Sequence, residues 1–205
     1  MPEILPGVVY TPGYLAPAEQ EALVAELREV VRAAPLFTPV MPRTGKPFSV
    51  RMTNCGSLGW VSDRERGYRY QPSHPETAAP WPPIPALALR AWEELGRYVA
   101  PPEACLVNFY DASARMGLHQ DRDGADVAAP LVSLSLGASC LFRLGGVERG
   151  APTRSFKLHA GDALVLAGPA RLAFHGVDRI LPGPAPFLPQ GGRINLTLRR
   201  VTKPD

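Results

Sequence analysis

The half of the chain that follows about residue 104 consists of short strand-like runs, and this pattern constrains the fold most. The runs are separated by Gly, Pro and Asp turns and read ACLVNFY, LVSLSLG, CLFRL, RSFKL, ALVLAG, RLAFHGV and RINLTLRR. Few of the later connections leave room for a helix, whereas parallel neighbours need a crossover of about a dozen residues or more. We therefore predict an antiparallel double-stranded β-helix (jelly roll) within an α+β fold that is mainly β.

Two amphipathic segments in the first half of the chain predict helices that flank this core. Residues 17–33 begin with a proline, and apolar side chains recur there at helical spacing: Leu23, Leu27, Val30 and Val31. A second helix is predicted over about 85–99, with Val99 on or near its apolar face. The length of 205 residues suits one domain. We expect a single domain over 1–205, with the helices in about 1–100 and the jelly roll in about 104–200.

Composition indicates a globular protein with no membrane partner. Hydrophobic residues make up 45% of the chain and charged residues 20%, as in soluble globular proteins. No apolar run approaches the ~20 residues of a membrane span, and the start MPEILPGVVYTPG is unlike a signal peptide. Cys55, Cys105 and Cys140 form no CxxC pair and no even disulfide framework. We therefore expect a cytoplasmic protein with reduced thiols.

Proline is unusually frequent in this chain. Its 24 residues are about twice the usual share of roughly 5%. Much of the proline falls in 35–47, 72–85 and 182–189, which we predict to be ordered loops around the core. A compositional bias of the genome explains the same frequency equally well.

A His-x-Asp pair, followed far downstream by a third polar residue, predicts a metal site. His119 and Asp121 are two positions apart, so in an extended backbone both side chains share a face. His175 follows the apolar run RLAF and is expected at the end of a strand. Two imidazoles and one carboxylate are the ligands of non-haem Fe(II) oxygenases, which leave metal positions open. Structural histidines and a surface turn at DRDGAD are the alternative interpretation.

The last strand-like run carries a polar face that can bind an acid. Period-two alternation in RINLTLR places four polar residues on one face: Arg193, Asn195, Thr197 and Arg199. An edge strand with this face in water is one interpretation. If the face lines a pocket instead, a guanidinium there can hold a carboxylate in two hydrogen bonds. Asn108 and Tyr110 share a face in VNFY by the same spacing, and the whole set suits a small dicarboxylate beside the metal.

Residues 41–70 are more basic than the rest of the chain. Six basic side chains stand there against Asp63 and Glu65, namely Arg43, Lys46, Arg51, Arg64, Arg66 and Arg69. This local excess exceeds the net charge of +3 of the whole chain. The segment is either a solvated loop or a patch that faces the phosphates of a nucleic acid.

Several of these runs together closely resemble the AlkB family of Fe(II)- and 2-oxoglutarate-dependent nucleic-acid dealkylases. They are NFYDASARMGLHQDRD, PLVSLSLG, FHGV and RINLTLR, and the upstream segment MTNCGSLGW…GYRYQPSHPETAAPWPPIP is similar to bacterial members. The likeness covers about residues 48 to 200. It implies oxidative demethylation of bases such as 1-methyladenine and 3-methylcytosine in DNA, with RNA left open. The implied cofactors are Fe(II), 2-oxoglutarate and O2, and the implied products are formaldehyde, succinate and CO2.

The resemblance also implies roles for individual residues. His119, Asp121 and His175 match the iron ligands, and five residues match the surroundings of 2-oxoglutarate: Asn108, Tyr110, Arg193, Asn195 and Arg199. Arg199 would pair with the keto-acid end, and Arg193 and Tyr110 would hold the distal carboxylate. Four residues match the substrate site: Trp60 and Tyr68 in a nucleotide-recognition lid, Asp123 facing the damaged base, and Arg149 near the pocket. The implied partner is alkylated DNA, with single strands favoured, and the protein is expected to be a monomer.

Two departures from the family pattern concern the substrate side alone. Residues 61–67 are one residue longer than the pattern, which affects the alignment of Tyr68, and Leu166 stands where bacterial members have a tryptophan. An oxygenase that acts on protein, lipid or RNA remains an alternative function. A nucleic-acid-binding module with a structural metal is another. A zinc hydrolase gives no reason for the paired arginines.

Overall fold

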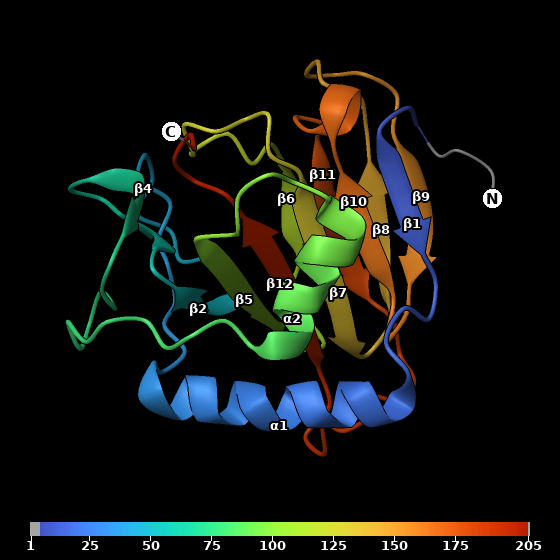
Figure 1. Ribbon diagram of the computed structural model, residues 1–205, viewed down its shortest axis with the longest axis horizontal. Coiled ribbons are helices and arrows are strands. Elements are labelled where there is room, and N and C mark those ends of the chain that lie inside the picture. Colours follow the sequence, from blue (N-terminus) through green and yellow to red (C-terminus); the bar gives the residue numbers. More distant parts are fainter. Residues whose placement is uncertain (1–4, 205) are drawn as a thin grey trace.

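The structure is a computed structural model that describes residues 5–204, and it consists mainly of two antiparallel sheets (Figure 1). The larger sheet contains, in spatial order, β1 (Val8–Thr11), β10 (Ala163–Leu166), β7 (Leu131–Gly137), β12 (Arg193–Arg199), β5 (Ala104–Tyr110) and β2 (Arg51–Gly56). The smaller sheet contains β6 (Met116–His119), β11 (His175–Ile180), β8 (Cys140–Leu144) and β9 (Arg154–Leu158). The predicted jelly roll with flanking helices is confirmed.

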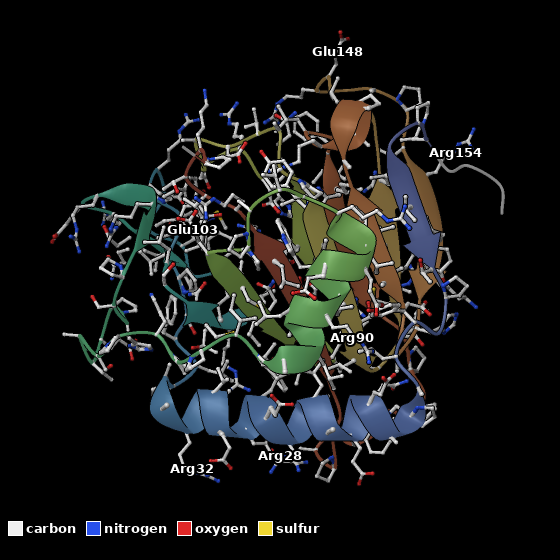
Figure 2. The ribbon with its side chains drawn as sticks, in the orientation of Figure 1. Arg28, Arg32, Arg90, Glu103, Glu148 and Arg154 are labelled. Atoms are coloured by element: carbon white, nitrogen blue, oxygen red, sulfur yellow. The ribbon has the colours of Figure 1, made fainter. Side chains whose placement is uncertain are left out.

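Two helices cover the outer face of the larger sheet (Figure 1). The first, α1 (Pro17–Ala33), has the predicted bounds and buries Leu23 and Leu27 against the sheet. Its charged face points outward, as the labelled Arg28 and Arg32 show in Figure 2. The second, α2 (Ala86–Ala91), continues into a π-helical turn, η1 (Trp92–Gly96).

The second helix is shorter than predicted. It ends at Gly96 because Arg97 adopts a left-handed conformation with φ 48° and its amide donates to the carbonyl of Trp92. Val99 lies beyond this stop and is 84% exposed, so the prediction that it belongs to an apolar helix face is wrong. None of the helices within residues 5–204 has the length and apolar character needed to cross a membrane.

Several strands were not predicted from alternation. In the first half these are β1, β2 and a separate hairpin of β3 (Gly59–Asp63) and β4 (Gly67–Gln71). Most of β2 and β3 is buried, so alternation does not mark them. In the second half, the predicted strand RLAFHGV begins only at His175. Arg171, the first residue of the predicted run, instead follows the 3-10 turn η2 (Gly168–Ala170) and has a buried side chain.

As predicted, the three proline-rich stretches are loops. They contain no helix or strand, and their only β pairing is through isolated bridges. One of these bridges joins Phe37 to Met52 of β2. The stretch 72–85 leads from the β3–β4 hairpin into α2. The proline-rich stretches are therefore loops that connect the elements of the fold.

The position of β12 in the middle of the larger sheet determines which way its side chains face. It pairs with β5 on one side and β7 on the other, so the edge-strand interpretation is wrong. Its apolar residues pack toward the helices, namely Ile194, Leu196 and Leu198. Its polar residues therefore face the smaller sheet, inside the jelly roll.

We expect Leu196→Ala to destabilise the protein by about 2–5 kcal/mol, because Leu196 is fully buried between the sheet and the helices. Urea unfolding followed by circular dichroism measures this change. Val99→Ala is the matched control and should stay within about 0.5 kcal/mol, since that side chain is exposed. Equal effects of the two substitutions would contradict the described packing of β12.

Candidate active site

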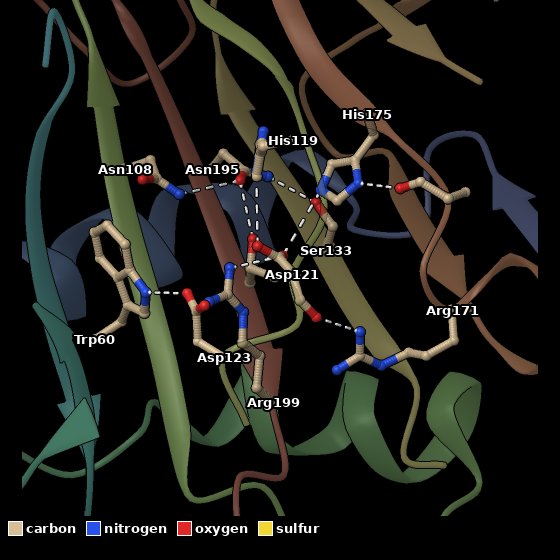
Figure 3. Close-up of polar contacts among 12 residues, drawn as sticks. Trp60, Asn108, His119, Asp121, Asp123, Ser133, Arg171, His175, Asn195 and Arg199 are labelled. Carbon is tan, nitrogen blue, oxygen red and sulfur yellow. Dashed lines mark hydrogen bonds and ion pairs between the residues drawn. The ribbon is translucent and has the colours of Figure 1, made fainter. Parts of the chain in front are cut away.

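The smaller sheet brings the three predicted metal ligands together. His119 ends β6, His175 begins β11, and the two residues are partners in the register of these strands. Asp121 follows two residues after His119, in the loop that leaves β6. The Nε2 atoms of His119 and His175 lie 3.6 Å and 3.7 Å from the two carboxylate oxygens of Asp121. All three candidate ligand atoms lie within 4.8 Å of one another (Figure 3).

Backbone carbonyls fix the orientation of both imidazoles. Nδ1 of His119 is 2.9 Å from the carbonyl oxygen of Gly117, and Nδ1 of His175 is 2.9 Å from that of Ala173. A carbonyl only accepts, so each Nδ1 carries the hydrogen and each Nε2 presents its lone pair to the metal position. Burial and the neighbouring His175 lower the pKa of His119, which keeps this ligand neutral as metal binding requires.

Two arginines hold Asp121, one through its carboxylate and one through its backbone oxygen. Nη2 of Arg199 donates to Oδ2 at 2.7 Å, and Nη1 of Arg171 donates to the backbone oxygen of Asp121 at 2.7 Å (Figure 3). Burial opposes ionisation, but Arg199 and the two histidines outweigh it and hold the pKa of Asp121 well below its usual range. The site therefore presents an ionised carboxylate beside the two imidazoles.

A cavity of about 850 Å³ extends from these ligands along the polar face of β12. The predicted co-substrate residues all contribute to its lining: Asn108, Tyr110, Arg193, Asn195 and Arg199. Burial raises the pKa of Tyr110, so its hydroxyl remains a neutral hydrogen-bond donor. The interior of the jelly roll is therefore a polar pocket beside the metal ligands.

Buried polar atoms in this cavity show what kind of ligand it fits. Arg193 is fully buried and donates from Nη2 to Ser135 at 2.8 Å, whereas its Nε and Nη1 have no partner among the described residues. The same holds for Nε of Arg199 and Oδ1 of Asn108. Leaving a buried guanidinium without partners costs several kcal/mol. These residues therefore fit a small acid such as 2-oxoglutarate, and the triad fits Fe(II).

Sequence reasoning misses some residues that support the site. Ser133 and Ser135 of β7 accept hydrogen bonds from Asn195 at 2.7 Å and Arg193 at 2.8 Å. The alternation in LVSLSLG marks their common face and could have revealed them. Arg171 is also missed, because nothing in the sequence distinguishes a buried arginine in a turn from an exposed one.

The predicted substrate residues lie at the mouth of the same cavity. Trp60 of β3 stacks on Tyr68 of β4 with ring centroids 5.6 Å apart, and its Nε1 donates to Oδ2 of Asp123 at 2.9 Å. Tyr68 is 49% exposed. Arg149 is exposed on the rim, with its guanidinium 5.3 Å from the ring centre of Phe174.

The two departures from the family pattern also have a place in the structure. The longer segment 61–67 forms the end of the β3–β4 hairpin, where Oδ1 of Asp63 accepts from the amide of Arg66 at 2.7 Å. Tyr68 remains on β4, opposite Ser62. Leu166 is buried in β10 and lines the cavity. The residue that departs from the pattern therefore forms part of the pocket wall.

A jelly roll with two histidines and one aspartate beside an arginine-lined pocket defines the class of Fe(II) oxygenases that use an acidic co-substrate. The three protein ligands leave positions for other groups, unlike the four ligands of a structural zinc site. This feature argues against a nucleic-acid-binding module whose metal is only structural.

Comparisons with known proteins agree with this class. The model of the 2OG-Fe(II) oxygenase superfamily matches residues 7–199. The alpha-ketoglutarate-dependent dioxygenase AlkB homolog of Caulobacter vibrioides is 55% identical over 97% of this chain and 89% of that protein. AlkB of Escherichia coli K12 is 40% identical over 90% of this chain and 86% of its own length. The solved structure of OsALKBH1 has a TM-score of 0.78 and 31% identity, covering 97% of this chain and 100% of that one.

The chain belongs to the AlkB family within the 2OG-Fe(II) oxygenase superfamily. It is thus an Fe(II)- and 2-oxoglutarate-dependent dioxygenase, as the resemblance implied. The cofactors of this family are Fe(II), 2-oxoglutarate and O2. The assignment of individual residues to these groups is a prediction that the geometry supports.

We expect Asp121→Asn to lower divalent-metal affinity by more than the ~10–100-fold that loss of an outer-shell partner costs. The amide removes the negative charge from the site and leaves Arg199 without its ion pair. Titration with Mn(II), which avoids turnover, measures the affinity. Asp178→Asn is the control, because Asp178 lies on the same strand as His175 with a more exposed side chain. Unchanged Mn(II) affinity in Asp121→Asn would contradict the assigned ligand set.

We expect Arg193→Met to leave the ligand-free protein at least as stable as wild type, because it removes a buried charge with few partners. The same substitution should abolish the rise in Tm that 2-oxoglutarate produces with Mn(II), since bound ligand stabilises only the folded state. Thermal unfolding with and without 2-oxoglutarate measures both effects. Arg179→Met, at an exposed position on β11, should keep the ligand-induced rise. A full rise in Arg193→Met would exclude Arg193 from co-substrate binding.

Proposed function

We propose that this dioxygenase removes N-linked methyl groups from damaged bases such as 1-methyladenine and 3-methylcytosine in DNA. The observation that carries the proposal is the cluster of Trp60, Tyr68 and Asp123 at the mouth of the cavity that holds the metal triad. Membership of the AlkB family supports a nucleic-acid substrate, and a similar human protein is named a nucleic acid dioxygenase. RNA is a further candidate substrate of the same chemistry.

The chemistry of the metal centre suits this reaction. When bound, Fe(II) with 2-oxoglutarate and O2 supplies the oxidation of the N-methyl carbon, which leaves as formaldehyde while succinate and CO2 are formed. The chain itself contributes binding and orientation. Asp121 and the two histidines hold the metal, and the arginines of β12 hold the co-substrate. No general acid or base is required.

The mouth of the cavity favours a cationic base. Methylation at the Watson–Crick edge of adenine or cytosine gives the base a positive charge. Asp123 supplies a carboxylate, and Trp60 supplies an aromatic face beside it (Figure 3). Oδ2 of Asp123 accepts from Trp60, while Oδ1 accepts no hydrogen bond from the described residues. We propose that Oδ1 of Asp123 accepts a hydrogen bond from the exocyclic amine of the base.

Exposed arginines around the cavity suit the phosphates of the strand. Arg115, Arg122 and Arg149 line the cavity and are exposed, and Arg64 and Arg66 are exposed at the end of the β3–β4 hairpin. Neutralisation of phosphates provides most of the sequence-independent affinity for nucleic acid. A methylated base must leave the duplex to reach the metal, and its blocked pairing lowers the cost of extrusion. Single-stranded DNA is therefore the favoured partner.

The remaining features of the proposal concern organisation and location. We treat residues 1–205 as one dioxygenase domain, with the helices and the lid in about 1–100 and the catalytic core in about 104–200. The β3–β4 hairpin corresponds to the lid, and it lies next to β2 and β5. We propose a monomer in the cytoplasm, where reducing conditions suit the three buried cysteines, none of which forms a disulfide.

We expect the protein with Fe(II) and 2-oxoglutarate to remove the methyl group from a single-stranded DNA oligomer that carries 1-methyladenine. Mass spectrometry follows the oligomer, and formaldehyde and succinate are measured in parallel. His119→Ala should abolish all three changes, because it removes a metal ligand, whereas His159→Ala, at an exposed histidine outside the cavity, should not. Succinate without demethylation would direct the search to RNA, protein or lipid substrates. If iron is bound and neither succinate nor demethylated oligomer appears, the proposal is refuted.

A further inference from the structure

Two directly opposed residues of the β3–β4 hairpin contact groups that adjoin the metal triad. Trp60 of β3 and Tyr70 of β4 are partners in the register of the hairpin. Trp60 donates to Asp123, and the hydroxyl of Tyr70 accepts from Nη1 of Arg199 at 2.9 Å. Both core partners adjoin the metal triad, because Asp123 follows Asp121 by two positions and Arg199 bonds Asp121 directly. The hairpin at the mouth is thus connected to the groups that hold the metal.

Arg199 is shared between the hairpin and the metal site. Its guanidinium donates from Nη1 to Tyr70 and from Nη2 to Asp121, and its side chain is 7% exposed. Its Nε is buried without a partner among the described residues, in the cavity assigned to 2-oxoglutarate. A guanidinium is planar, with its donors in a rigid fork. A ligand that binds in the cavity and reorients the guanidinium of Arg199 therefore also changes the hydrogen bond between Arg199 and Tyr70.

The two strands of the hairpin differ in how they are attached. Asn54 of β2 bonds both the amide and the carbonyl of Trp60, at 2.9 Å and 3.0 Å, so β3 is fixed independently of the metal site. On β4, the backbone oxygen of Gln71 accepts from the buried Trp81 at 2.9 Å, Tyr68 is half exposed, and the Tyr70 hydroxyl bonds Arg199. A two-stranded hairpin alone is marginally stable in water. Among these contacts of β4, that of Tyr70 is the one that leads to the metal site.

We propose that Tyr70 is a positioning residue that couples the substrate lid to the loading of metal and co-substrate through Arg199. Loading fixes Arg199, and Arg199 fixes β4 with its stacked Tyr68, so the lesion site is completed only in the loaded protein. Coupling of this kind is reciprocal, so a bound lesion tightens 2-oxoglutarate by the same factor. The nucleic-acid part of this inference rests on the proposed function, whereas the link between loading and the lid does not.

The first experiment measures the lid without any nucleic acid. Hydrogen exchange of the amides in residues 59–71 is compared in the metal-free protein and in the protein with Mn(II) and 2-oxoglutarate. We expect loading to slow exchange in wild type and to have a much smaller effect in Tyr70→Phe. Tyr68→Phe is the matched control, since it makes the same chemical change on the same strand and its hydroxyl bonds no described residue. It should respond to loading as wild type does.

The second experiment measures the coupling itself. Calorimetric titration gives the affinity of the Mn(II) protein for 2-oxoglutarate with and without an oligomer that carries 1-methyladenine. We expect the oligomer to tighten 2-oxoglutarate about fivefold or more in wild type, the lower end of ordinary coupling between sites. The factor should fall toward one in Tyr70→Phe and persist in Tyr98→Phe, which makes the same chemical change at a tyrosine outside the cavity.

The outcomes separate this inference from the proposed function. Equal lid protection in wild type and Tyr70→Phe, or none in wild type, would overturn the inference. Lid protection that depends on Tyr70, together with no binding of the oligomer, would support the link and refute the proposed substrate. A folding defect in Tyr70→Phe would lower its Tm. The wild-type comparison needs no variant and still tests whether loading slows exchange in the lid, and no slowing would overturn the inference.

Discussion

Two arginine side chains buried between the sheets are the constraint on which the rest of the site depends. Strand alternation in β12 turns Ile194, Leu196 and Leu198 toward the helices, so Arg193 and Arg199 must face the interior of the jelly roll. Buried guanidinium groups require partners. Arg199 pairs with Asp121, whereas Arg193 bonds one serine and keeps donors for a ligand. Burying guanidinium donors without partners costs folding free energy, and the same donors make the cavity specific for an acidic co-substrate.

The metal ligands depend on the same network. Arg199 keeps Asp121 ionised and oriented despite its burial, and register pairing of β6 with β11 places the two histidines beside it. Backbone carbonyls then fix both rings with Nε2 facing the metal position. These outer contacts prepare the ligands before the ion binds. The chemistry therefore depends on strand register and on buried charge pairs.

Substrate recognition is placed on more exposed residues. The β3–β4 hairpin and the loops at the mouth carry exposed residues such as Tyr68 and Arg149. Loops and their neighbours tolerate change better than the strands they connect. This explains why the longer segment 61–67 departs from the family pattern without altering the triad. Leu166 is different, because it changes the wall of the pocket itself.

The sequence by itself indicated the His119–Asp121 pair, the polar face of β12 and the helix 17–33, because these depend on local spacing. His175 lies beside the pair because β11 pairs with β6. Spacing did not reveal that β12 lies in the middle of its sheet, nor that Arg171 and Tyr70 hold Asp121 and Arg199. Such facts depend on contacts between residues far apart in the chain. Only the tertiary structure decided which polar side chains are buried together, since burial and charge pairing arise when the sheets and the hairpin pack.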